Sequence, residues 1–127
     1  MHNLINRNKA AKYFANYYPE IKEEIRFLSL RKNFAGIIQS IINYLFHLLE
    51  QSKQIIVVSK IKEMGWLYTR GNHDVKDLIE NLFVRSFRAM QKRCNPKEWN
   101  FLLEKCPIAF QNIYQNQINK DQQLKIK

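Results

Sequence analysis

The hydrophobic positions of this chain recur mainly at the three- and four-residue spacing of an α-helix. The most regular segment is residues 34–51, whose apolar side chains share one wide face: Phe34, Ile37, Ile38, Ile41, Ile42, Leu45, Leu48 and Leu49. Its polar residues fall opposite: Gln39, Asn43, His47 and Glu50. So wide an apolar face predicts a helix at the centre of the domain.

A second strong helix is predicted over residues 72–93. Asn72 is suited to cap its start, because an asparagine side chain accepts hydrogen bonds from the first free backbone N–H groups. Helical spacing gives its core face as Val75, Leu78, Ile79, Leu82, Phe83, Phe87 and Met90. In this register Val84 points away from the core, near Arg88, and is expected to be exposed.

Residues 54–66 allow two interpretations. Residues 55–58 are β-branched and typical of a strand, whereas Val57, Ile61, Met64 and Tyr68 keep helical spacing. No second strand candidate is available, and a lone strand leaves its backbone polar groups unpaired. We therefore interpret the segment as a helix that ends near Gly65 or Thr69.

The remaining segments predict shorter helices. Residues 6–18 form one, and Pro19 ends it and begins the next. Asn95, Pro96 and Glu98 have the cap, first-turn proline and third-position glutamate of a new helix, and Pro107 separates it from a last one. We predict an all-α fold, a single-domain bundle of about six helices over residues 1–118, with residues 119–127 as a polar, frayed tail.

Composition and charge narrow the function classes. The chain has 127 residues, 3 Gly and 3 Pro, which fits one domain and disfavours a turn-dense β-sandwich. Its net charge of +10 is spread out with no block of five like charges, so it predicts weak attraction to polyanions. The N-terminus lacks a signal-peptide pattern, and the apolar run 37–49 is too short to span a bilayer. We expect a cytoplasmic protein with reduced thiols and no membrane span.

Catalytic and metal-binding patterns are weak. His2, His47 and His73 occur singly, and His47 with Glu50 gives two ligands where zinc needs three or four. Asp74 and Asp77 share a helix face as paired catalytic carboxylates do, but the positive end of a helix explains the same spacing.

No cysteine–histidine pair is brought together by the pattern. The candidates are Cys94 or Cys106 with His47 or His73, and cysteines on apolar helix faces are usually small core residues. The glycines stand alone and form no phosphate-binding loop. We expect no enzymatic activity, no cofactor and no metal.

A basic stripe is the first candidate for binding. Arg85, Arg88 and Lys92 lie at positions i, i+3 and i+7, where they could follow phosphates, and residues 31–32 and 60–62 could extend them. The favoured interpretation is a solvated helix face partly neutralised by Asp74 and Asp77. The tyrosines of residues 13–18 could stack on bases, but their spacing favours the core.

An aromatic patch is the second candidate. Trp66, Tyr68, Arg70 and His73 follow one another at a helix end where a loop must reach the surface. Tryptophan, tyrosine and arginine often anchor protein interfaces. The alternative is that Trp66 closes the end of the core, and the sequence favours neither interpretation.

The order of segments also carries a resemblance. Residues 13–24 (Tyr13, Phe14, then YYPEIKEE), the helix over 37–49, residues 55–64 and 78–90, and Asn95, Pro96 and Trp99 follow one another. This order resembles a group of small, uncharacterised all-helical bacterial proteins classed as a domain of unknown function. The resemblance implies a bacterial helical fold, with HEAT-like antiparallel helix pairs, and no established activity. A role in a toxin–immunity or defence locus is an analogy that suits such a chain.

Two functions therefore remain. The leading hypothesis is a non-catalytic protein–protein interaction module of a regulatory or immunity type. The alternative is a nucleic-acid-binding protein that uses the basic stripe. The pattern leaves the oligomeric state open.

Overall fold

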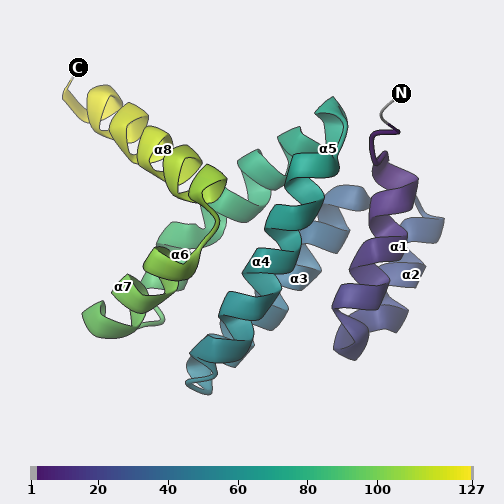
Figure 1. The fold of residues 1–127 in the computed structure, drawn as a ribbon, viewed down its shortest axis with the longest axis horizontal. Coiled ribbons are helices and arrows are strands. Elements are labelled where there is room, and N and C mark those ends of the chain that lie inside the picture. The colour runs from purple at the N-terminus through teal and green to yellow at the C-terminus, as the bar shows by residue number, and fades with distance from the viewer. Residues whose placement is uncertain (1–2, 127) are drawn as a thin grey trace.

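The computed structural model describes residues 3–126, and these form helices and no strand (Figure 1). In chain order the elements are α1 (Arg7–Tyr17), the 3-10 turn η1 (Pro19–Ile21), α2 (Lys22–Leu30), α3 (Phe34–Glu50), α4 (Gln54–Arg70), α5 (His73–Leu78), the π turn η2 (Ile79–Phe83), the 3-10 turn η3 (Val84–Ser86), α6 (Phe87–Gln91), α7 (Pro96–Lys105) and α8 (Ile108–Ile126). Elements α5 to α6 follow without a break and form one rod, hereafter the α5–α6 rod. The all-α fold class is confirmed. Across residues 3–126 no helix is long and apolar enough to cross a membrane.

Helix α3 lies at the centre of the fold, as its wide apolar face predicts. Seven of its side chains are buried: Ile37, Ile38, Ile41, Ile42, Leu45, Leu48 and Leu49. They contact helices on several sides, because α2, α4 and the α5–α6 rod all pack against α3. The predicted polar face, with Gln39, Asn43, His47 and Glu50, is exposed.

The first four helices form two antiparallel pairs, α1 with α2 and α3 with α4 (Figure 1). The turns after α2 and α3 have the same geometry. Lys32 and Ser52 have positive φ angles, and the N–H groups of Asn33 and Lys53 donate to the carbonyls of Leu28 and Leu48. This is the Schellman ending, which reverses the chain within three residues.

Short-range signals placed several helix starts correctly. The side chain of Asn72 accepts a hydrogen bond from the first turn of α5, as predicted, and those of Asn6 and Asn33 do the same at the starts of α1 and α3. Asn95 and Glu98 form the predicted capping box, in which each side chain bonds the other's backbone N–H. Helix α4 confirms the helical interpretation of residues 54–66 and continues to Arg70.

The α5–α6 rod contradicts the expectation that Val84 is exposed, because Val84 is fully buried. The cause is the π turn η2, which has one more residue per turn than an α-helix. Each side chain after the turn is therefore rotated backward about the helix axis by about 100°, the angle between successive residues of an α-helix. This rotation brings Val84 inward and keeps Phe87 and Met90 buried as well.

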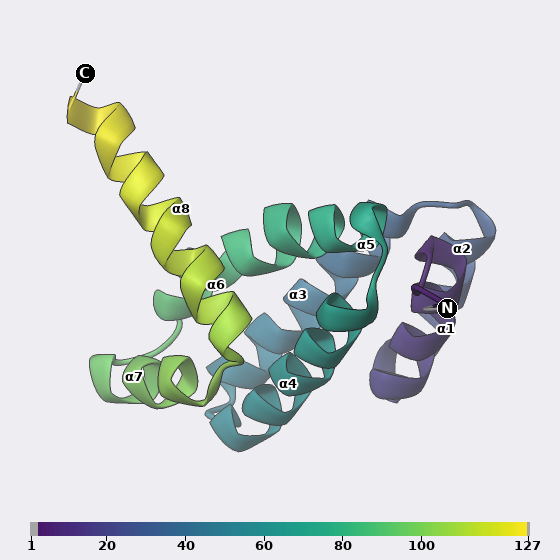
Figure 2. The same cartoon turned by 45° about the horizontal axis from the view of Figure 1, so that its top comes forward.

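Helix α8 packs across the α5–α6 rod and then extends beyond the rest of the molecule (Figure 2). Its base is anchored by Phe110, whose ring packs against the rings of Phe83 and Phe87. Gly65 on α4 allows this approach, since a Cβ there would lie 2.5 Å from Pro107 Cγ. The helix continues to Ile126, through most of the segment where a frayed tail is expected.

The π turn predicts that this chain tolerates a deletion there. Removing Asn81, an exposed residue of η2, should convert the rod to a regular α-helix and leave its buried face in register. Removing Asn43, exposed in the middle of α3, should instead turn all later α3 side chains out of the core. Each lost core residue costs about 2–5 kcal/mol against a total stability of about 5–15 kcal/mol.

Circular dichroism during urea unfolding distinguishes the two deletions. The Asn81 deletion should keep a cooperative transition and a helical spectrum, and the Asn43 deletion should lose both. Equal damage by the two deletions would contradict the role assigned to the π turn.

Candidate functional site

Trp66 lies at the C-terminal end of α4 among aromatic side chains from α1. Its ring centroid lies 5.3 Å from that of Tyr13 and 6.1 Å from that of Tyr17, the latter edge-on. The guanidinium of Arg70, one helical turn later, lies over the indole ring at 4.2 Å. Trp66 is partly buried against the core. We call Tyr13, Tyr17, Trp66 and Arg70 the aromatic platform.

The chain before α1 forms one side of the platform. The N–H of Ile5 donates to the carbonyl of Arg70, and the carbonyl of Ile5 accepts from the N–H of Asn72, both at 2.8 Å. These bonds fix Asn3 and Leu4 beside the end of α4. Together with three of the platform residues they line a hollow of about 570 Å³, whose wall consists of Asn3, Leu4, Ile5, Tyr13, Trp66, Thr69 and Arg70.

Of the four residues predicted for protein binding, Trp66 and Arg70 lie together and Tyr68 and His73 do not join them. Tyr68 points to the other side of α4, where its ring contacts Phe110 and its hydroxyl donates to Glu80 Oε2 at 2.7 Å. Burial and the Glu80 carboxylate raise the pKa of Tyr68 to about 12. His73 is exposed at the start of α5, 3.3 Å from Asp77.

Sequence reasoning missed two parts of this site. Tyr13 and Tyr17 carry an i, i+4 signal, but their position opposite Trp66 depends on how α1 packs against α4. The segment of Asn3 to Ile5 has no periodicity at all. Its place depends on two backbone hydrogen bonds to residues about 65 positions later in the sequence.

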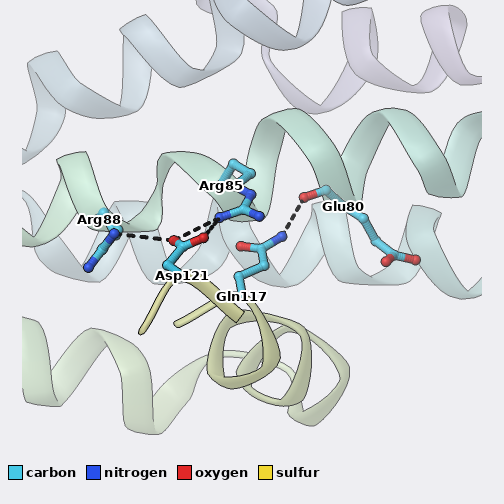
Figure 3. Close-up of polar contacts among 5 residues, drawn as sticks. All are labelled: Glu80, Arg85, Arg88, Gln117 and Asp121. Atoms are coloured by element: carbon cyan, nitrogen blue, oxygen red, sulfur yellow. Dashed lines mark hydrogen bonds and ion pairs between the residues drawn. The ribbon is translucent and has the colours of Figure 1, made fainter. Parts of the chain in front are cut away.

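The predicted basic stripe meets a carboxylate from α8. Asp121 accepts from Arg85 at 3.0 Å and from Arg88 at 3.2 Å, and Gln117 donates to the backbone carbonyl of Glu80 in the π turn (Figure 3). Lys92 is exposed and has no ion pair among residues 3–126. Two of the three basic side chains are thus partly neutralised.

The expected neutralising partners of the stripe are wrong, and so is its extension through Lys60. Asp74 lies 3.9 Å from Arg7, and Asp77 lies beside His73 instead of the stripe arginines. Lys60 lies on the opposite side of the fold, where its Nζ donates to the carbonyl of Tyr17 in α1. A helical spacing identifies neighbours on one helix, whereas Asp121 reaches the stripe from another.

Metal and nucleophile candidates remain scattered across the described part of the chain. No three His, Cys, Asp or Glu side chains of residues 3–126 are grouped to hold a metal, and His2 lies outside these residues. His47 shares a hydrogen bond with Gln51 on the exposed face of α3. Cys106 is buried and Cys94 partly buried, and burial raises the pKa of both thiols.

The buried thiol of Cys106 predicts a loss of stability at alkaline pH. Burial raises its pKa from 9.0 to about 12, so the unfolded chain loses this proton at lower pH than the folded chain. The unfolding free energy should therefore fall as pH rises from about 9 to about 12, by up to about 1.4 kcal/mol per pH unit. Tyr68, with its ordinary value of 10.0, contributes only above about pH 10.

Urea unfolding of wild type and Cys106→Ala at about pH 8 and about pH 10 tests this assignment. At about pH 8 Cys106→Ala should be less stable than wild type, because the smaller side chain leaves a cavity. Its unfolding free energy should fall less than that of wild type between about pH 8 and about pH 10, because the thiol is gone. Cys94→Ala serves as the control thiol. An unchanged pH dependence in Cys106→Ala would show that other groups cause the loss.

Comparison with known proteins places the chain in a family. Searches of the curated proteins and of the solved structures each found no match. The family described as "Domain of unknown function (DUF7674)" matches residues 11–120, from the second turn of α1 into α8. This match includes all four residues of the aromatic platform, as well as Arg85 and Arg88. The family match covers most of the chain's length, so the chain belongs to the DUF7674 family.

Proposed function

We propose that this chain is a non-catalytic protein-binding module and that the aromatic platform is its binding site. The observation that carries the proposal is the position of Trp66. Its indole lies at the rim of an open hollow, held between two tyrosine rings and the Arg70 guanidinium. A regulatory or immunity-type role is the setting that we propose for it.

The chemistry of the platform suits a protein partner. Tryptophan, tyrosine and arginine contribute most of the binding energy in many interfaces, especially where they border a pocket. Here the rings are already packed against one another, and Arg70 also donates to the carbonyl of Trp66. A partner would therefore lose little side-chain entropy when it binds, which favours affinity.

The placement of titratable groups supports the non-catalytic part of the proposal. General acid–base or nucleophilic chemistry requires partners within hydrogen-bond reach. His47 contacts Gln51, His73 pairs with Asp77 on another exposed surface, and neither histidine lines the platform hollow. The more buried thiol, Cys106, has a pKa of about 12 and holds its proton at neutral pH.

Substitution at the platform should abolish capture of a specific partner. We expect a protein retained by the immobilised wild type to be lost with Trp66→Ala, since interface anchors typically cost about 2 kcal/mol or more. Arg70→Ala, which leaves the core untouched, should weaken capture as well. Phe101→Ala removes an exposed aromatic ring on α7 and serves as the matched control.

Quantitative affinity purification with wild type, Trp66→Ala, Arg70→Ala and Phe101→Ala measures how much partner each protein retains. Circular dichroism must first show that Trp66→Ala is folded. Retention of the same partners by wild type and both platform variants would contradict the proposed site.

The alternative function, nucleic-acid binding by Arg85, Arg88 and Lys92, is disfavoured by the Asp121 contact (Figure 3). We expect binding to mixed-sequence DNA or RNA to be weak and to vanish between about 50 and 300 mM salt, as counterion release predicts for non-specific contact. Changing the three residues to Ala should reduce it no more than changing three other exposed basic residues. Tight binding at the higher salt that this triple variant loses would favour the alternative.

A further inference from the structure

The hollow at the platform is the first of three that follow one another across α1. It shares Asn3, Ile5 and Tyr13 with a second hollow of about 330 Å³. The second shares Lys12 and Asn16 with a third, of about 430 Å³, between α1 and α2. Because neighbouring hollows have wall residues in common, they lie next to one another along α1, and we call this row of three hollows the α1 trough.

The charge of the trough has a single sign. Its basic side chains are Lys9, Lys12, Arg26 and Arg70, and no carboxylate is among the described residues that line it. Arg26 lies 3.5 Å from Glu23, at its edge. Lys9 and Lys12 form no ion pair within residues 3–126. The trough therefore presents unneutralised positive charge along an exposed stripe of α1.

Apolar side chains lie at both ends and along the floor of the trough. Leu4, at the platform end, is 54% exposed, and Leu30, at the α2 end, is 86% exposed. Between α1 and α2 the floor includes Ala11 and Ala15, whose small side chains leave the third hollow open. Exposed leucines beside basic side chains match a partner that carries both apolar and acidic residues.

We propose that the α1 trough binds an acidic segment of a partner protein whose apolar side chains contact the Leu4 and Leu30 ends. This inference rests on the proposed protein-binding function and specifies the chemistry of its partner. A second copy of this chain is a poor occupant, because each copy carries a net charge of +10.

A nucleic acid suits the trough less well than an acidic protein segment does. The Arg70 guanidinium lies over the Trp66 indole and would have to move before a base could stack there. The two exposed leucines also offer apolar surface, which phosphates do not match.

Selection from random peptides tests the proposal without assuming a sequence. A library of displayed 16-residue peptides is selected on the full chain and, in parallel, on Trp66→Ala. Peptides that wild type retains and Trp66→Ala loses should be enriched in Asp and Glu together with apolar residues. These peptides should bind Lys9→Glu/Lys12→Glu about tenfold more weakly than wild type. Each reversed charge at a solvated site should weaken binding about threefold, and the two effects multiply.

A variant with equal net charge separates the trough from the overall charge. Lys105→Glu/Lys120→Glu reverses two exposed lysines on α7 and α8, away from α1 (Figure 1), and should bind the peptides as wild type does. Neutral or basic selected peptides, or equal loss with both charge-reversal variants, would overturn the proposal. So would mixed-sequence RNA that binds tightly and depends on Lys9 and Lys12.

The outcome is distinguishable from failure of the proposed function. If the partner captured by wild type requires Trp66 but binds Lys9→Glu/Lys12→Glu normally, the protein-binding function stands and the acidic-segment proposal is wrong. If neither partners nor peptides depend on Trp66, both are wrong.

Discussion

The burial of α3 is the constraint on which the other helices depend. Its apolar residues cover so much of its circumference that one partner helix cannot bury them all. Helices α2 and α4 and the α5–α6 rod therefore pack on different sides of it. This arrangement also brings α1 beside α4, so that Tyr18 is fully buried and donates its hydroxyl hydrogen to the carbonyl of Lys60. The aromatic platform forms one turn further along the same pair, where Tyr13 and Tyr17 meet Trp66.

The π turn and helix α8 depend on each other. By setting back the later side chains, η2 turns Val84, Phe87 and Met90 inward and leaves Arg85 and Arg88 toward α8. Gln117 then donates to the Glu80 carbonyl within the turn, where the regular helical hydrogen-bonding pattern is interrupted. The outer part of α8 has little apolar contact, with Leu124 mostly exposed, so the polar contacts of Gln117 and Asp121 hold it in place (Figure 3).

The sequence predicted those features that depend on neighbours within about one or two helical turns. The central position of α3, the Asn72 cap and the Asn95–Glu98 capping box follow from spacing and local hydrogen bonding. The inward rotation of Val84 could not be predicted in this way, because the π turn leaves no simple periodic signal in the sequence. In the candidate site, Trp66 and Arg70 were grouped because they are close together at a predicted helix end, and they do lie together because they are one helical turn apart. Tyr68 was grouped with them by adjacency, although successive helical positions point in different directions.

The two basic surfaces of the molecule differ in what faces them. At the stripe, Arg85 and Arg88 converge on Asp121, so an incoming phosphate would have to displace a carboxylate that is already there and three-quarters buried. At the α1 trough, Lys9 and Lys12 face solvent, and an exposed leucine lies at each end of the trough. Apolar surface gains free energy from burial only against another apolar surface, whereas a positive field gains from any anion. The combination of both along one helix therefore favours an amphipathic acidic protein segment over a polyphosphate chain.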